Sequence, residues 1–492
     1  MSFFKNLLLN LPEVAGPTQK RLSFKEKLKW TTIILVLFFI LGMIPLFGLG
    51  ANTLQQFEYL SIILGAKFGS IISLGIGPIV TASIVLQLLN GSGLLKFDLT
   101  SQDGKKTFQG VQKLLAYFFI LFESCIYVFM GGLSTGSFYN PATGEFLEYA
   151  TGSNIMALEP STIFALKAFL ILQLCVGGLL IMLMDEIVSK WGFGSGISLF
   201  IAAGVSQEIF IRAFSWFKSA DAVGGAEYSS GEVIKFFQAI ASSDPDLKVA
   251  GLALIVILST VVIFALAVYL QAMKIEIPLS FGRIRGHGIR WPLNFIYTSN
   301  IPVILVAALF ANMQLWAKLL EKWGHPLLGT IDAAGNKAGI IAWINPPGGM
   351  DGLAGIVIRQ GTMAIGARPY LQATAYLIAM VIGCVIFSYF WVQTAGMDAR
   401  SQAKQIMSSG LQIPGFRKDQ RVLERLLDRY IGPLTIMGAI AIGILAALAD
   451  LLGALSRGTG ILLAVMIVYK LYEEIAQQHM MDMHPALRKM MG

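Results

Sequence analysis

Charged residues are scarce in this chain of 492 residues: only 13% are Asp, Glu, Lys or Arg, whereas 55% are hydrophobic. A soluble domain carries about 25% charged residues, so this chain has too few polar side chains to cover a water-facing surface. Backbone that crosses lipid must satisfy its own hydrogen bonds, which leaves helices or closed barrels. The apolar runs are about 20 residues long and do not alternate with polar residues, so they predict membrane-spanning helices.

Cysteine, histidine and catalytic motifs are also rare or missing. The three cysteines, Cys125, Cys175 and Cys384, lie far apart inside apolar runs, which argues against a disulfide framework or a thiolate metal site. The sequence holds no Walker motif and no HExxH, and Asp450 is the only aspartate within an apolar run. We therefore expect no cofactor, no metal and no enzymatic activity.

Ten apolar runs are long enough to cross a bilayer. They lie near 29–48, 71–90, 113–133, 161–184, 196–214, 249–273, 293–316, 372–395, 430–452 and 458–476. Five precede residue 235 and five follow it, and an odd number makes the two halves insert in opposite orientations. The sequence thus predicts an all-α integral membrane protein whose halves, 29–235 and 236–476, are inverted five-helix units.

Basic residues predict the orientation of the chain. Most Lys and Arg fall in segments that share one side if the N-terminus is cytosolic, as the positive-inside rule expects. Ten spans return the tail, 477–492, to the cytosol as well. Within the cytosolic segment 1–28, Met1–Leu11 has one apolar helical face and is stopped by Pro12. It predicts an amphipathic helix on the membrane surface, or else an unstructured terminus.

Several segments depart from the pattern of apolar helix and polar loop. Phe57–Leu64 is apolar but too short to span, so it is either an interfacial helix or a re-entrant one. Gly75-Ile76-Gly77-Pro78 loosens the start of the second span and places Ile76 and Val80 on one face. Taken alone, this motif is explained better by glycine-mediated helix packing than by a special role. Glu123 lies in the middle of the third span, where a carboxylate costs roughly 2.5–3.5 kcal/mol and needs a partner or a proton.

Two cytosolic loops, 274–292 and 396–429, are long and rich in Arg, Gly and Pro. Positive-inside bias and contact with anionic lipid account for basic loops in general. Clustered arginines between flexible turns also suit a phosphate-rich partner such as ribosomal RNA. The net charge of +8 is compatible with either interpretation.

The order of these motifs resembles SecY, the channel subunit of the Sec translocon, in its archaeal form. The resemblance covers nearly the whole chain and rests on long segments. They are Leu74–Ala82 with Leu86–Leu89, Asp185–Lys190, Gly194–Ile197, Phe281–Arg283, Ser299–Ile304 and Gly415–Arg417. The resemblance implies two halves around an hourglass pore, hinged behind spans five and six, with a lateral gate to lipid between spans two and seven. It also implies a SecE-type small subunit, a second small subunit, a docked ribosome, and clients that carry signal sequences.

Residue roles follow from the same resemblance. The implied pore ring is Ile76, Val80, Ile197, Ile201, Ile304 and Leu463. The implied plug, near 55–68, includes Phe57, Leu60, Ile62, Ile63 and Leu64. Thr81, Glu123 and Asn312 would form a polar cluster at the lateral gate, and Arg283, Arg285, Arg417 and Lys418 would hold the ribosome.

A secondary transporter is the competing interpretation. Inverted repeats, interrupted helices and a buried carboxylate would suit one. A transporter is expected to place several polar or ionisable groups at the midplane, yet the predicted midplane is almost entirely aliphatic apart from Glu123. The third alternative, an intramembrane protease, is not supported, because the sequence lacks the catalytic groups that such an enzyme needs. The resemblance to SecY therefore implies a channel in the cell membrane that translocates unfolded polypeptides and releases apolar segments sideways into lipid.

Overall fold

The structure is a computed structural model, and most of the chain is described by it. The described residues are 12–18, 22–52, 66–91, 94–95, 97, 102–129, 132–135, 138–140, 145–147, 160–217, 228–241, 246–281, 288–299, 301–322, 324–330, 338–347, 352–361, 366–408, 411–412, 419–455 and 457–483. The predicted N-terminal surface helix, Met1–Leu11, lies outside them.

Each predicted span overlaps one long helix. In the first half these are α2 (Phe24–Met43), α4 (Gly77–Gly91), α5 (Gln102–Phe129), α6 (Pro160–Trp191) and α7 (Gly196–Phe214). In the second half they are α9 (Leu247–Ala272), α10 (Ile301–Lys322), α13 (Ala367–Thr394), α15 (Gln420–Leu451) and α16 (Arg457–Met483). Within the described part of the chain, seven helices are long and apolar enough on their own to cross a membrane. The helical membrane fold is confirmed, and the count of ten crossings stays a prediction.

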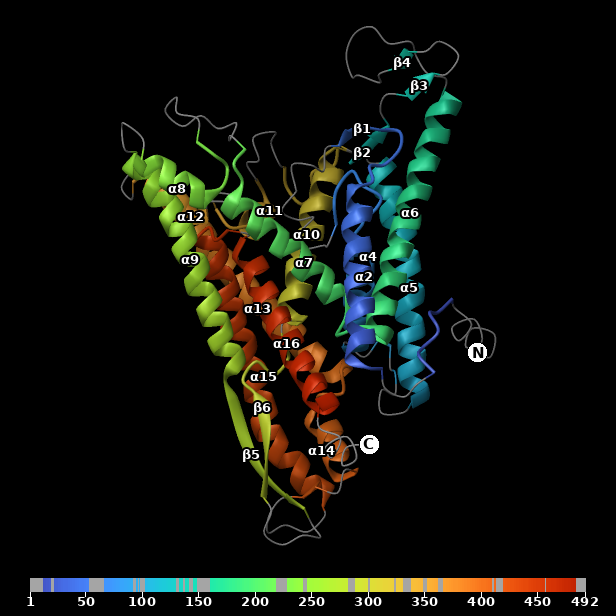
Figure 1. The fold of residues 1–492 in the computed structure, drawn as a ribbon, viewed down its shortest axis with the longest axis vertical. Coiled ribbons are helices and arrows are strands. Elements are labelled where there is room, and N and C mark those ends of the chain that lie inside the picture. Colours follow the sequence, from blue (N-terminus) through green and yellow to red (C-terminus); the bar gives the residue numbers. More distant parts are fainter. Residues whose placement is uncertain are drawn as a thin grey trace.

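The remaining elements are short and lie between these helices. The short helices are α8 (Glu232–Ala241), α11 (Ile340–Trp343), α12 (Gly352–Gln360) and α14 (Ala399–Ser408). The strands are β1 (Leu49–Asn52), β2 (Leu133–Thr135), β3 (Phe138–Asn140), β4 (Glu145–Leu147), β5 (Lys274–Phe281), β6 (Gly288–Asn294) and β7 (Leu411–Gln412). They pair as β1-β2, β3-β4 and β6-β5-β7, all antiparallel. Figure 1 shows the long helices side by side, with β3-β4 at one end and the β5-β6 hairpin and α14 at the other.

Several predicted boundaries differ from the structure. The seventh span begins at Ile301 rather than at 293, because β6 continues to Asn294 and residues 295–299 form bends and turns. The loop 274–292 is mostly a β-hairpin, and the loop 396–429 contains α14 and the first turns of α15. The tenth helix continues to Met483, into the predicted tail. Hydropathy marks where a helix enters lipid and cannot mark where polar helical turns extend beyond it.

Of the three hydrophobic clusters in the described part of the chain, one is a small contact between α8 and α9, and the other two hold most of the molecule together. The larger one runs through both halves, and in it α4 packs against α5, α10 and α13 while α16 packs against α7 and α9. The smaller one joins the hairpin to α13, α14 and α15 through buried side chains such as Ile277, Ala403 and Leu427. At its edge the Tyr297 hydroxyl donates to the Met397 carbonyl at 2.7 Å. Burial and the nearby charge of Asp398 raise the pKa of Tyr297 well above its ordinary value, which keeps this donor protonated.

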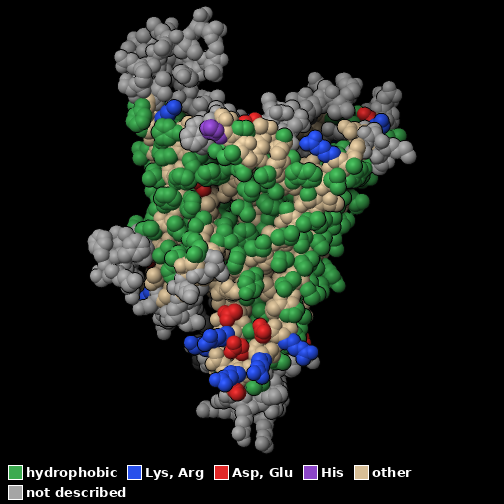
Figure 2. Space-filling view, turned by 180° about the vertical axis from the view of Figure 1, so that it is seen from behind, with side chains coloured by type: hydrophobic (Ala, Val, Ile, Leu, Met, Phe, Trp, Pro, Cys, Tyr) green, Lys and Arg blue, Asp and Glu red, His purple; other side chains and the backbone are tan. Residues whose placement is uncertain are grey.

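The first and last helices lie against each other. The Gln478 amide donates to the Leu22 carbonyl at 3.0 Å, and the rings of Phe24 and His479 are 5.6 Å apart. The start of α2 and the end of α16 therefore share one side of the bundle, as an even number of crossings requires. Figure 2 shows hydrophobic side chains over the middle of one face and charged ones gathered at its lower end.

Candidate functional site

A cavity of about 500 Å³ lies where six long helices converge, with walls from α4, α5, α7, α10, α13 and α16. Three of the six predicted ring residues line it: Val80, Ile197 and Ile304. The other three are no more than 1% exposed and belong to the same core cluster: Ile76, Ile201 and Leu463. Three of the predicted ring residues, from α4, α7 and α10, thus line one cavity, and the other three are buried in the same hydrophobic core.

The polarity of the cavity wall changes along its helices. On α4 the lining passes from Val80 to Gln87 two turns later, and on α16 it passes from Ile467 to Lys470 and Glu474. The polar residues lie toward the end of the bundle that carries α14, because the last turn of α13, including Thr394, lines the same cavity. The cavity is therefore aliphatic at its inner end and polar at its outer end.

The start of α4 is positioned by close packing against α6. Gly177 lies so near the turn at Ile71 that an added Cβ would meet the Ile71 carbonyl oxygen at 1.9 Å. Gly75 has a φ of +56°, which glycine adopts without strain and which lets the chain turn into α4. The Val80 amide then donates to the Ile76 carbonyl at 3.0 Å, so both side chains share one face.

The start of α7 is capped by a side chain from another helix. Its own N-cap residue, Ser195, makes no side-chain capping bond. Instead, the Ile197 amide donates to Oδ1 of Asp185, near the end of α6, at 2.9 Å. Gly196 permits this approach, because an added Cβ would lie 2.6 Å from the Asp185 Cα. Asp185 therefore satisfies free backbone donors of α7 at the point where Ile197 and Ser198 reach the cavity.

A polar triad joins the two halves beside the cavity. Asn312 of α10 donates from Nδ2 to the Thr81 hydroxyl of α4 at 3.0 Å. That hydroxyl lies 3.2 Å from Oε1 of Glu123 on α5 and 2.9 Å from the Gly77 carbonyl, and donates its proton to either. Glu123 is only 4% exposed, and its Oε2 has no hydrogen-bond partner among the described residues. Thr81 thus contacts both other predicted gate residues, and its hydroxyl is the partner available to Oε1 of Glu123.

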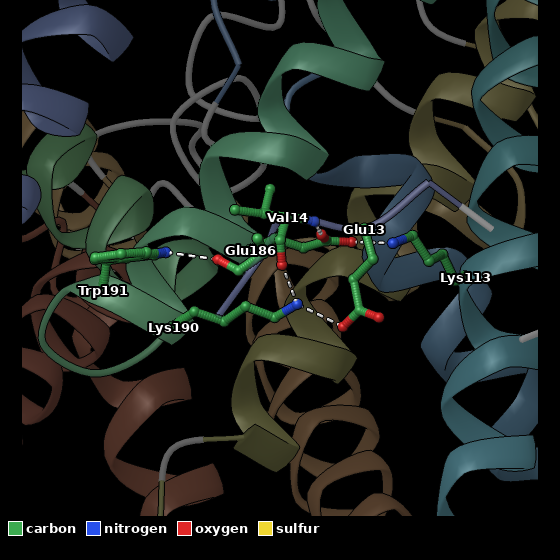
Figure 3. Close-up of polar contacts among 7 residues, drawn as sticks. Glu13, Val14, Lys113, Glu186, Lys190 and Trp191 are labelled. Carbon is green, nitrogen blue, oxygen red and sulfur yellow. Dashed lines mark hydrogen bonds and ion pairs between the residues drawn. The ribbon is translucent and has the colours of Figure 1, made fainter. Parts of the chain in front are cut away.

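A short N-terminal segment, residues 13–15, contacts the end of α6, which also contacts α5 (Figure 3). Glu186 accepts from the Val14 amide at 2.9 Å and forms an ion pair with Lys113 of α5. Lys190 contacts the Glu13 carboxylate and donates to the Val14 carbonyl, and the Trp191 indole donates to the Ala15 carbonyl at 2.9 Å. Because Asp185 adjoins Glu186, the same end of α6 holds the N-terminal segment, α5 and α7.

Two predicted sites lie outside the described residues. These are the plug residues (Phe57, Leu60, Ile62, Ile63, Leu64) and the basic ribosome-binding residues (Arg283, Arg285, Arg417, Lys418). The flanks of the two basic loops are described, however. Strand β7 pairs with the end of β5, with Ser280 opposite Gln412 and Phe281 opposite Leu411. Pairing of β5 with β7 therefore places the flanks of the two loops side by side in one sheet.

Sequence reasoning missed the capping role of Asp185. The motif Asp185–Lys190 entered only as part of the resemblance. The sequence carries little signal for it, because Ser195 precedes the helix and serine is itself a preferred N-cap residue. Only the structure shows that the Ser195 side chain makes no capping bond and that Asp185 of α6 accepts from the Ile197 amide instead.

A bundle of apolar helices around a cavity, with polar contacts between its two halves, defines a membrane channel or transporter. The family model described as SecY matches residues 70–472, and the one described as the plug domain of Sec61p matches residues 36–69. The chain therefore belongs to the SecY family.

Full-length relatives support this assignment. The protein translocase subunit SecY of Methanothermobacter thermautotrophicus is 42% identical over 99% of this chain and 98% of that protein. A solved structure of a protein-conducting channel matches with a TM-score of 0.77 and 38% identity, covering 98% of both chains. Sec61 in the canine ribosome-channel complex matches with a TM-score of 0.74 and 38% identity over the same shares.

Proposed function

We propose that this chain is the channel subunit of a protein translocase, which conducts unfolded polypeptides across a membrane and releases apolar segments sideways into lipid. The observation that carries the proposal is the convergence of aliphatic residues from both halves at the inner end of one cavity. Membership of the SecY family supports the same activity and does not favour the solute transporter.

The proposed constriction is the ring of Ile76, Val80, Ile197, Ile201, Ile304 and Leu463. A translocating polypeptide carries every kind of side chain, so fixed charges or strong hydrogen-bond donors in the ring would trap some of them. Aliphatic side chains offer no such sites and yield by changing rotamer. A narrow apolar ring also excludes water, which opposes ion leak. The apolar segment Phe57–Leu64 would seal the ring as a plug.

The proposed lateral gate is the seam between α4 and α10. The triad of Thr81, Glu123 and Asn312 bridges that seam, since α4 and α5 belong to the first half and α10 to the second. Each such hydrogen bond inside a membrane contributes roughly 0.6–2 kcal/mol to the closed arrangement. An apolar client helix would open the seam by offering contacts that compete with this closure.

The proposed ribosome site consists of Arg283, Arg285, Arg417 and Lys418 in the two basic loops. Support comes from β7, which pairs with the end of β5 and so places the flanks of the loops side by side, and from a charged recess between the starts of α14 and α15. Asp398, Arg400, Arg421, Glu424, Arg425 and Asp428 line that recess. Contacts to RNA phosphates would make binding steeply dependent on salt.

The remaining proposals concern partners and location. A SecE-type single-span subunit and a second small subunit would complete the channel in the cell membrane. Both termini would be cytoplasmic, because the start of α2 contacts the end of α16 and the basic residues cluster in the loops of that side. The two five-helix halves would be inverted repeats.

Reconstitution tests the function directly. The chain, purified with its small partner subunit and placed in liposomes, should bind ribosomes and import a secretory polypeptide, and should not accumulate small solutes. Solute uptake without polypeptide import would overturn the proposal.

Ion conductance in a planar bilayer tests the ring. Glycine substitutions at Ile76, Ile197 and Ile304 should raise the leak, most clearly when residues 57–66 are deleted. Leu88 is 37% exposed on α4, so Leu88→Gly is a matched control and should not raise it. Equal leak from the two sets would remove the ring assignment.

A salt series tests the ribosome site. Reversing the charges at Arg283, Arg285, Arg417 and Lys418 should weaken ribosome binding and flatten its salt dependence. Protein yield and melting temperature should stay unchanged. Unaltered affinity across the series would contradict the site.

A further inference from the structure

An aromatic pair crosses the seam between the halves. Phe122 of α5 and Trp316 of α10 have ring centroids 5.9 Å apart, with their planes inclined by 37°. This separation lies within the range in which aromatic rings attract each other beyond simple burial. A second ring, Phe118, stacks on Phe122 at 5.5 Å but comes from α5 itself and does not cross the seam.

The pair and the polar triad occupy different depths of the same seam. Phe122 adjoins Glu123 in sequence, and Trp316 lies one helical turn from Asn312. Phe122 is 38% exposed and Phe118 is 55% exposed, whereas Glu123 is 4% exposed. An exposed face of a spanning helix faces lipid, so the rings lie on the lipid side and the triad lies inside.

We propose that Phe122 and Trp316 form an aromatic latch on the lipid side of the gate, and that this latch sets how apolar a client helix must be to part the two halves. The proposal rests on the proposed function of the seam as a lateral gate. The partner of the latch is an apolar helical segment of the client, rich in large aliphatic or aromatic side chains.

The physical reason is an exchange of contacts. When the gate opens, the ring-ring contact is lost, and the half-exposed rings must find other apolar neighbours. A client helix with large apolar side chains supplies them to both rings at once, whereas a helix with polar side chains on that face does not. The latch also keeps lipid chains away from the Glu123 carboxyl, whose exposure to hydrocarbon would be costly.

The test is a double-mutant cycle on client selection. Phe122→Leu, Trp316→Leu and the double variant are reconstituted, and insertion of signal sequences of graded hydrophobicity is measured. Loss of an aromatic pair should favour the open gate by about two- to tenfold, so that less apolar clients insert. Either substitution alone removes the contact between the two rings. The second substitution should therefore add no further shift, and the double variant should have the same threshold as each single variant.

Phe118→Leu is the matched control, since it removes an exposed ring from the same helix without touching α10. Its threshold should equal that of the wild type. Melting temperature in detergent should be similar for all four variants. Additive shifts from the two single changes, no shift at all, or an equal shift from Phe118→Leu would each overturn the latch.

Failure of the latch can be told apart from failure of the gate itself. Phe122→Cys and Trp316→Cys, combined in a chain whose native cysteines are replaced by Ala, allow the seam to be locked by a short bismaleimide. The locked chain should no longer release apolar segments into lipid. Normal release from it would place the gate elsewhere, whereas blocked release with unshifted thresholds in the Leu variants would remove only the latch.

Discussion

Val80 and Thr81 are neighbours on α4, yet they belong to two different surfaces of the molecule. Val80 lines the central cavity among aliphatic residues, and Thr81 joins Glu123 and Asn312 across the seam between the halves. Aliphatic contacts have no preferred direction and re-form around any side chain that passes. Hydrogen bonds are directional and hold one arrangement against others. Adjacent positions on α4 therefore suit the two proposed roles, with Val80 in the pore ring and Thr81 in the lateral gate.

The largest effect is expected when a hydroxyl and a methyl group are exchanged at positions 80 and 81, because this changes hydrogen bonding with little change in side-chain shape. Thr81→Val should leave the Asn312 amide and Glu123 Oε1 without their shared partner, at a cost of roughly 1–3 kcal/mol to the closed gate. Client insertion should then extend to less apolar signal sequences. Val80→Thr is the matched control, because its hydroxyl can bond back to the Ile76 carbonyl and it leaves the triad intact. An unchanged threshold in Thr81→Val would contradict a gating role for the triad.

The second test separates the shape of Glu123 from its hydrogen bonding. Glu123→Gln keeps an oxygen that can accept from Thr81, whereas Glu123→Leu does not. We expect Leu to destabilise the closed gate by roughly 0.6–2 kcal/mol and Gln to stay close to the wild type. Thresholds for the same graded signal sequences measure both variants. If Gln and Leu behaved alike, the hydrogen bond would not be what closes the seam.

The third test asks whether a polar contact positions the aliphatic wall. Asp185→Ala removes the cap of α7 and should destabilise its first turn by roughly 0.5–2 kcal/mol, while Asp185→Asn keeps an acceptor. A Cys placed at Ile197, in a chain without native cysteines, should react faster with a thiol reagent once the cap is lost. Equal reactivity in the Ala and Asn variants would show that Asp185 does not position this residue.

The smallest effect is expected where the polar contact is most exposed. The Glu13 side chain is 65% exposed, so Glu13→Gln should cost less than about 1 kcal/mol, and less than Glu186→Gln, whose ion pair with Lys113 is largely buried. Protection of the N-terminal segment from proteolysis would measure the difference. A larger effect from Glu13→Gln than from Glu186→Gln would reverse this order.

The same contact has a defined pH dependence. The hydrogen bond from Lys190 holds the pKa of Glu13 below its ordinary value of about 4.3. A lowered carboxyl pKa stabilises the folded arrangement at neutral pH, and that stabilisation is lost as the pH falls through the folded pKa. Protection of the segment should therefore decline only below about pH 4.3 and should be insensitive to pH above it.

The sequence alone determined the class of the protein and the approximate place of its helices. Hydropathy is a local property of each segment, because a run of apolar residues must be buried in lipid or protein wherever it packs. It can therefore be read without knowing the tertiary structure. The glycines and proline before Ile79 likewise predicted a loosened start for α4, which begins at Gly77 after a turn. The family resemblance then supplied roles for residues that spacing could not distinguish from ordinary packed aliphatics.

Only the tertiary structure decided which side chains meet. Thr81 and Asn312 are 231 residues apart, and no local pattern relates them. The cap that Asp185 supplies to α7 and the ring contact between Phe122 and Trp316 likewise depend on how helices from distant parts of the chain are placed. A side-chain contact forms within a few ångströms, so it depends on the rotation and tilt of both helices, whereas hydropathy specifies neither.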